Sequence, residues 1–195
     1  MSRRPERIQD VRGYVLHTSA WRETSLIVQG FTRDYGCVAL AAKGAKRPYS
    51  VLRPILVAFQ PVFLSWSGAG EVKTLIRAET EGVRLLNGRA MMSAWYMNEL
   101  ILRLLAREDP HPGVFDAYEA ALLQLMDQQH SPAGALRRFE WVLLDETGYG
   151  QAGAAPDFDD PQAEPMLRLS LRDRLDALLE SPLHTRKILM DLQRY

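Results

Sequence analysis

The fold of the first part of this chain is decided by residues 24–42, TSLIVQGFTRDYGCVALAA. Two apolar runs, 24–32 and 37–42, flank the letters RDYG, in which Asp34 and Gly36 favour a turn. Short apolar and β-branched runs on either side of a tight turn are typical of an antiparallel hairpin. We therefore expect a β-sheet here, and the residues on both sides extend it.

Three more strands are expected around this hairpin, at residues 11–16, 62–66 and 72–79, with a glycine-rich turn at 67–70 between the last two. Residues 51–60 are apolar but interrupted by Pro54, and they fit either extended chain or a short helical turn. Five short strands within about seventy residues, with a longer connection between the third and fourth, predict a small Greek-key barrel of the OB type. An SH3-like barrel has similar strand spacing.

Beyond residue 81 the apolar residues recur at helical spacing. Helices are expected at 90–107, at 115–126, between Pro132 and Gly148, and at 184–193. Ser131 is the expected N-cap of the third helix, with Pro132 in its first turn and Gly148 at its end. We therefore expect an α+β chain, with an OB-fold barrel domain at 1–80 and an all-helical domain at 81–195.

A break in the helical pattern lies at residues 151–165, which hold three prolines and four acidic residues. This composition predicts a loose acidic linker. Ser170 and Asp173 have the spacing of a capping box, which predicts that the next helix begins near Ser170.

Charge is distributed unevenly along a chain whose net charge is zero. Residues 1–80 contain 12 Lys and Arg against 6 Asp and Glu, a net charge of +6, and residues 81–195 contain 12 against 18, a net charge of −6. Clustered positive charge attracts phosphate over about a Debye length, roughly 8–10 Å. The asymmetry indicates a polyanion-binding surface on the first part, and a chance division of solvated charges is the alternative.

Enzymatic and membrane functions find little support in the sequence. The four histidines are dispersed and Cys37 is the single cysteine, so neither metal-ligand spacing nor an internal disulfide is expected. Cys37 begins an apolar run and is expected to be a buried, inert thiol. No stretch has the roughly 18–20 apolar residues that cross a bilayer, and the polar N-terminus does not resemble a signal peptide. We expect a cytoplasmic protein that is not an enzyme and needs no cofactor or metal.

The candidate DNA-binding residues are cations and aromatics of the predicted barrel: Trp21, Arg22, Lys43, Lys46, Arg47, Tyr49, Arg53, Lys73 and Arg77. Cations displace counterions from phosphates, and aromatic rings offer bases a stacking face. Lys73 and Arg77 are an even number of residues apart on one strand, which predicts a shared face. The alternative is that Trp21 and Tyr49 cap the barrel ends and the cations are only solvated. Binding would be mostly electrostatic and weakly sequence-specific, because no base-reading helix is apparent.

A second candidate site lies in the acidic helical part, where Arg137 and Arg138 stand beside Phe139 and Trp141. Paired arginines next to aromatic residues suit a peptide that carries carboxylates and an apolar side chain. The alternative is that both arginines form ion pairs with Glu140 or Asp145.

Several short motifs in a fixed order resemble the RecO family of bacterial recombination-mediator and DNA-repair proteins. They are residues 15–26, VLHTSAWRETSL, then KGAK at 43–46, GEVKTL at 70–75, YMNEL at 96–100, ALRRFE at 135–140 and GYG at 148–150. A weaker resemblance resumes at residues 185–187. Two features depart from the family pattern. Many relatives carry a four-cysteine zinc module after the GYG motif, which has no counterpart here, and the region between Gly150 and Leu171 is short.

The resemblance implies an OB-fold domain beside a helical domain, binding of single- and double-stranded DNA, and strand annealing in recombinational repair at the nucleoid. It also implies cooperation with RecR, and in some organisms RecF, in loading RecA onto DNA coated with single-strand-binding protein (SSB). The acidic, apolar C-terminal tail of SSB would bind the helical domain at Arg137 or Arg138. A generic OB-type binder of single-stranded nucleic acid, including RNA, is the alternative, and a nucleotide- or phosphodiester-directed enzyme is a third.

Overall fold

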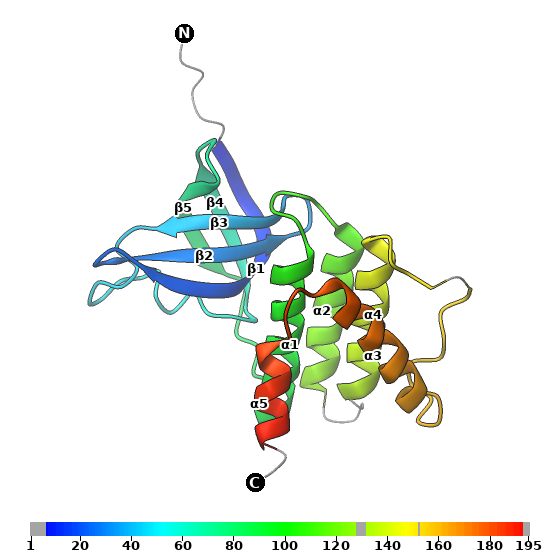
Figure 1. Ribbon diagram of the computed structural model, residues 1–195. Helices are drawn as coiled ribbons and strands as arrows, with labels where there is room; N and C mark the ends of the chain where they lie inside the picture. Colours follow the sequence, from blue (N-terminus) through cyan, green and yellow to red (C-terminus); the bar gives the residue numbers. More distant parts are fainter. Residues whose placement is uncertain (1–6, 128–131, 152, 193–195) are drawn as a thin grey trace. The chain divides into compact units, whose positions relative to one another are not determined.

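The computed structural model describes residues 7–127, 132–151 and 153–192 of the chain (Figure 1). The chain divides into two compact units. The first comprises the chain through Arg84 together with the short segment Ala106–Pro110. The second comprises Leu85–Leu105 and the chain from His111 onward.

The first unit is a closed barrel of five strands: β1 (Arg7–Trp21), β2 (Ser25–Thr32), β3 (Gly36–Ala42), β4 (Pro61–Ser67) and β5 (Val72–Thr80). The strands follow the order β1-β2-β3-β5-β4, and β4 pairs with β1 to close the barrel. All neighbours are antiparallel except β3 and β5, which are parallel. The expected five-stranded OB-type barrel is confirmed.

The hairpin expected at residues 24–42 forms from β2 and β3. Its register runs from Leu26 opposite Ala42 to Thr32 opposite Gly36, and Gly36 adopts a positive φ of 62° at the turn. Alternate residues of these strands point into a barrel core that includes Val28, Leu40 and the fully buried Trp66 of β4. Burying each large apolar side chain contributes about 1.5–3 kcal/mol, so the core accounts for the sheet's closure.

A register shift interrupts the regular alternation of β5 where it pairs with β4, opposite Ser65 and Trp66. Leu75 and Ala78, three residues apart, are both buried. The prediction that Lys73 and Arg77 share a face assumed strict alternation through this point, and it is wrong for that reason.

The segment Ala106–Pro110 folds against the end of the hairpin. The Glu108 backbone N–H donates to the Cys37 carbonyl oxygen over 3.0 Å, and a Cβ on Gly36 would overlap the Asp109 carbonyl oxygen. Cys37 is buried there, as expected, and burial raises the pKa of its thiol to about 12. The thiol is therefore protonated at neutral pH and is a poor nucleophile.

The second unit contains α1 (Gly88–Leu104), α2 (Pro112–Met126), α3 (Pro132–Glu146), α4 (Glu164–Leu178) and α5 (His184–Leu192). The expected apolar stripes form its core, which includes the buried side chains of Met97, Leu100, Tyr118, Phe139 and Leu143. None of these helices, within the described residues, has both the length and the apolar composition needed to cross a membrane.

The helix ends show where local sequence decided the structure. The Asn87 side chain caps α1 by accepting from the Ala90 N–H over 2.9 Å. Gly148 follows α3 at a positive φ of 84°, with its N–H donating to the Asp145 carbonyl, so it closes the helix as predicted. The predicted N-cap Ser131 and the predicted last residue of α5, Gln193, lie outside the described residues.

The predicted start of α4 is wrong. The helix begins at Glu164, with Pro165 in its first turn, and Ser170 lies inside it. The Ser170 hydroxyl accepts a hydrogen bond from Gln151 Nε2 over 2.8 Å and caps nothing. Proline in the first helical turn therefore outweighed the capping-box spacing that Ser170 and Asp173 share.

Candidate nucleic-acid interface

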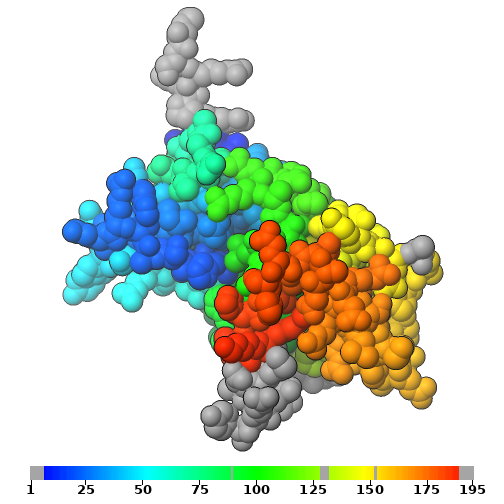
Figure 2. Space-filling model, viewed as in Figure 1, coloured from blue at the N-terminus to red at the C-terminus, as the bar shows by residue number. Residues whose placement is uncertain are grey.

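Two connections lie next to each other at one end of the barrel, the β1–β2 turn and the long β3–β4 connection. The Lys46 backbone N–H donates to the Thr24 carbonyl oxygen over 2.9 Å, which ties one connection to the other. Figure 2 shows the turn in blue and residues 43–53 in cyan, protruding together from the barrel. We call residues 43–53 the cationic loop.

The β1–β2 turn holds Trp21 and Arg22 against each other. Trp21 ends β1 opposite Ser25, and Arg22 follows at a positive φ of 54°. The Arg22 Cζ lies 4.3 Å from the centroid of the Trp21 ring, a cation–π contact. Trp21 is half-buried, whereas Arg22 and the neighbouring Glu23 are exposed. The turn thus offers one ring and one guanidinium at the same place.

The cationic loop is fixed to the barrel by apolar side chains. Ala45 is fully buried and Leu56 nearly so, and Leu52 and Ile55 pack partly against the same core. The stretch 51–60, which the sequence left open, forms hydrogen-bonded turns, including one from the Leu56 N–H to the Leu52 carbonyl over 2.9 Å. The spacing of residues 52, 55 and 56 could have revealed this anchoring from the sequence.

The basic side chains of the cationic loop all reach solvent. Lys43, Lys46, Arg47 and Arg53 are exposed, and within the described part of the chain none has a carboxylate at ion-pair distance. Gly44 adopts a positive φ of 72°, and the Arg47 side chain lies over it, 3.5 Å from where a Cβ would stand. Unpaired cations held on an ordered backbone can neutralise phosphates without first losing an internal partner.

Tyr49 stands out in the cationic loop because its side chain is fully exposed. Its backbone has a positive φ of 63°, which is uncommon for a bulky residue and costs conformational energy. The ring therefore does not cap the barrel, and both of its faces are available to a stacking base.

The two basic residues of β5 lie in a different environment. Lys73 forms an ion pair with Glu108 and its side chain is 11% exposed. Arg77 binds Glu79 at 2.5 Å and lies 3.7 Å from Asp10. The structure therefore brings seven predicted residues together, namely Trp21, Arg22, Lys43, Lys46, Arg47, Tyr49 and Arg53, and it leaves Lys73 and Arg77 neutralised by their own carboxylates.

In the helical unit, Arg137 is buried. Its Nη2 donates to Glu140 Oε1 over 2.8 Å, and its Nη1 lies 3.5 Å from Glu164 of α4. The Tyr96 hydroxyl donates to the same Glu140 oxygen over 2.6 Å. Burial raises the pKa of Glu140, and the nearby Arg137 opposes that shift. The internal ion pair with Glu140, which the sequence analysis kept as an alternative, is present.

Arg138 points to a different side of α3 and is partly exposed. Its Nη2 lies 3.3 Å from Asp159 Oδ2, and its Cζ lies 5.4 Å from the ring centroid of Phe158. Trp141, one turn further along, also contacts Phe158. Of the two predicted arginines, Arg138 is the one that solvent and a peptide can reach.

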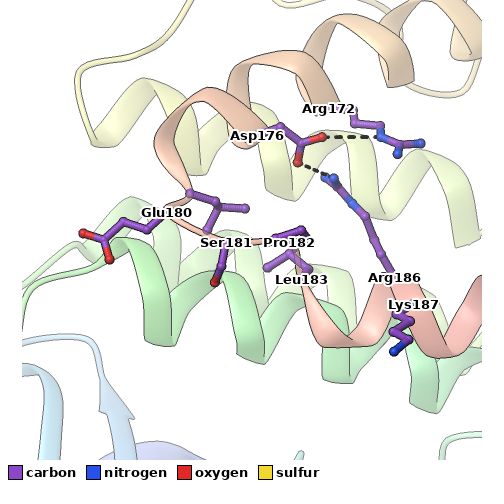
Figure 3. Close-up of a pocket in the computed structure, with 9 residues that line it drawn as sticks. Arg172, Asp176, Glu180, Ser181, Pro182, Leu183, Arg186 and Lys187 are labelled. Atoms are coloured by element: carbon purple, nitrogen blue, oxygen red, sulfur yellow. Dashed lines mark hydrogen bonds and ion pairs between the residues drawn. The ribbon is translucent and has the colours of Figure 1, made fainter.

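A pocket of about 480 Å³ lies between the end of α4 and the start of α5 (Figure 3). Leu179, Pro182 and Leu183 provide its apolar lining. Asp176 forms ion pairs with Arg172 of the same helix and with Arg186 of α5, as the dashed lines in the figure show. Both arginines of the pocket are therefore already paired with the Asp176 carboxylate.

Over the described residues, no three His, Cys, Asp or Glu side chains lie together in a way that could hold a metal ion.

The barrel places this chain among the OB-fold proteins, which commonly bind oligonucleotides through loops such as the one between the first two strands. Residues 7–83 match the family described as Recombination protein O N terminal, and residues 85–159 match Recombination protein O C terminal. The chain therefore belongs to the RecO family.

Three relatives illustrate the similarity. The DNA repair protein RecO of Aromatoleum aromaticum is 57% identical over 146 residues, which cover 74% of this chain and 60% of that protein. The DNA repair protein RecO of Azoarcus sp. is 51% identical over 146 residues, with the same 74% and 60% coverage. That of Cupriavidus pinatubonensis is 51% identical over 154 residues, covering 77% and 52%. The chain thus spans 52–60% of the length of these relatives.

Proposed function

We propose that this protein binds and anneals DNA strands during recombinational repair, without enzymatic turnover, through the cationic end of its barrel. The observation that carries the proposal is the cationic loop, in which Lys43, Lys46, Arg47 and Arg53 are exposed without carboxylate partners among the described residues. Family membership supports a role in repair, since the curated relatives are named DNA repair proteins. Such a protein would work at the nucleoid.

Annealing follows from the same chemistry as binding. Two complementary strands repel each other through their phosphates, and bound cations reduce that repulsion by displacing counterions. Tyr49 and Trp21 would stack unpaired bases, whose Watson–Crick edges remain free to pair with a second strand. Contacts of this kind favour no particular sequence, as a protein that acts along a whole chromosome requires. Duplex DNA would bind through its phosphates alone.

The helical unit would provide the partner contacts. We propose that the acidic, apolar tail of SSB binds α3 at Arg138 and Trp141. Buried Arg137 would position this helix by pairing with Glu164 of α4 and by holding Glu140, which accepts from Tyr96 of α1. Cooperation with RecR, and with RecF in some organisms, would then load RecA onto the coated strand. Family membership supports these partners.

The decisive experiment is annealing of complementary strands coated with SSB, followed by the fluorescence change of end-labelled DNA. The native chain should accelerate annealing without nucleotide, and the combined variant Lys43→Ala, Lys46→Ala, Arg47→Ala should not. A matched control, Arg7→Ala, Arg33→Ala, Arg77→Ala, removes the same charge from other parts of the barrel and should anneal normally. Equal activity of both variants would remove the cationic loop from the mechanism. Competition between DNA and RNA strands would reveal a general single-strand binder if both compete equally.

A further inference from the structure

Part of this chain lies on the face of α3 where a partner's acidic peptide is proposed to bind. The segment is Asp157-Phe158-Asp159-Asp160, within the connection drawn yellow to orange between α3 and α4 in Figure 1. We call it the internal acidic segment. It combines carboxylates with one large apolar ring, which is the chemistry expected of the partner.

Its contacts with α3 are specific. Asp159 Oδ2 lies 3.3 Å from Arg138 Nη2. The Phe158 ring meets Trp141 edge to face, with ring centroids 6.1 Å apart and planes at 72°. The Arg138 Cζ lies 5.4 Å from the centroid of the Phe158 ring, so the guanidinium contacts both the aromatic and the acidic residue. One arginine and one tryptophan thus hold an acidic and an aromatic side chain together.

Gly134 of α3 allows the close approach of this segment. A Cβ at that position would lie 2.6 Å from Asp159 Oδ1 and 2.9 Å from the Phe158 carbonyl oxygen, both closer than atoms can pack. An alanine there would fit the helix itself, because alanine favours helix over glycine. A Gly134→Ala substitution should therefore disturb the docking of the segment without weakening α3.

The internal acidic segment is also shaped in advance. Asp157 Oδ1 accepts from the Asp159 N–H over 3.0 Å, and Asp160 Oδ1 accepts from the Gln162 N–H over 2.8 Å. These local turns present Phe158 and Asp159 toward α3. Beyond them, Glu164 reaches Arg137 at 3.5 Å and fixes the start of α4.

The contacts are nevertheless displaceable. The side chains of Arg138 and Asp159 remain 40% and 66% exposed, and ion pairs with that much solvent contact are weak. What keeps such a segment in place is its covalent attachment, which gives it a high effective concentration at α3. A free peptide with more carboxylates can compete with it.

We infer that the internal acidic segment acts as an intramolecular competitor on α3, so that an acidic, apolar peptide of a partner binds only when the segment leaves. This inference rests on the proposed binding of such a peptide by the helical unit. A site that its own chain occupies nine-tenths of the time binds an external ligand about tenfold more weakly than the vacant site.

The test uses the full chain and the double variant Phe158→Ala, Asp159→Asn. Two fluorescent peptides serve as probes, one copying residues 156–161 of this chain and the other the SSB tail. Both should bind the double variant about tenfold more tightly than the native chain. Gly134→Ala should act in the same direction, because it expels the segment. Arg138→Ala, added to the double variant, should abolish the gain.

The matched control is Leu169→Ala, Asp173→Asn, which removes one apolar and one acidic side chain from exposed positions of α4. It should bind both peptides as the native chain does. The inference is overturned if the double variant binds the peptide of residues 156–161 no more tightly than the native chain and the control. If that peptide gains affinity while the SSB tail binds no form of the protein, the internal competition stands and the proposed tail binding is overturned.

Discussion

The cationic loop of the barrel and helix α3 both carry arginines that the sequence marks as binding residues, but their surroundings are opposite. Arg47 is exposed with no carboxylate at ion-pair distance among the described residues, whereas Arg137 is buried and paired with Glu140. A guanidinium that must first break an ion pair with an internal carboxylate gains little net free energy from binding an external one. The comparison teaches that pairing and burial, rather than the presence of arginine, separate a ligand-binding cation from a structural one.

The largest effect on stability is expected from removing a buried charge of the helical unit. Arg137→Ala leaves the Glu140 carboxylate buried without its cation, which should cost about 3–5 kcal/mol of the free energy of unfolding. The neighbouring Arg138→Ala, whose ion pair is exposed, should cost less than about 1 kcal/mol. Thermal unfolding of both variants measures the difference, and a melting temperature for Arg137→Ala within 2 °C or so of the native value would contradict the structural role.

The next effect is on DNA affinity. Each phosphate neutralised on a single strand strengthens binding roughly fourfold at 0.15 M salt, so replacing Lys43, Lys46 and Arg47 together with alanine should weaken it about 50-fold. Stability should change little, because all three side chains are exposed. Fluorescence anisotropy with a labelled oligonucleotide gives the affinity. The variant of Arg7, Arg33 and Arg77 described above is the control, and an equal loss in both would mean that only net charge matters.

The aromatic contribution should be smaller. Tyr49→Ala removes an exposed ring that stacks on a base, a contact worth about 1–3 kcal/mol, and for one solvent-exposed ring we expect the lower part of that range, roughly tenfold in affinity. Because the ring touches no core, and because alanine like tyrosine carries a Cβ at this positive φ, the same variant should unfold at about the native temperature. Tyr35→Ala, at the hairpin turn between β2 and β3, is the matched control and should bind DNA normally. Unchanged affinity of Tyr49→Ala would assign the loop a purely electrostatic role.

The smallest effect concerns a paired charge on α1. Glu99 accepts from the Thr185 N–H and hydroxyl, the His184 N–H and Arg103. Burial alone would raise the pKa of Glu99, but these partners together lower the pKa below its ordinary value. A lowered pKa stabilises the folded state above the unfolded value, and this contribution is lost as the pH falls through the folded value. Glu99→Gln should therefore cost about 1–2 kcal/mol of the free energy of unfolding at pH 7 and less at pH 3.

Urea unfolding at both pH values checks this last expectation. If Glu99→Gln lowers the free energy of unfolding equally at both pH values, Glu99 stabilises the α1–α5 contact through packing rather than charge. DNA binding by the barrel should not change in either case.

The barrel was the most predictable part of the molecule. Its hairpin carries both two short apolar runs and the turn residues Asp34 and Gly36, so local and long-range preferences agree. The start of α4 at Glu164 was not predicted, because it depends on competition between two local signals. Proline in the first turn and a capping box each contribute about 0.3–1.5 kcal/mol to helix stability. The register shift on β5 was not predicted, because it occurs in the pairing with β4.

The basic residues of the candidate site could be predicted from the sequence, but their ion-pair partners could not. The sequence shows that Lys43 and Lys73 are both basic residues of the barrel, and only the fold shows that Lys73 meets Glu108, 35 positions away. The same holds for Arg138 and Asp159, which come together through the connection between α3 and α4. Ion pairs between distant segments depend on tertiary structure, which periodicity does not specify.

The most direct test of the central claim is the salt dependence of single-strand binding. If Arg22 and the four exposed cations of the cationic loop each neutralise one phosphate, the plot of log affinity against log salt should have a slope of about −3.5. The variant lacking Lys43, Lys46 and Arg47 should give about −1.4, and the control variant should keep the native slope. A native slope near zero, or one that the loop variant leaves unchanged, would contradict the assignment of DNA binding to the cationic loop.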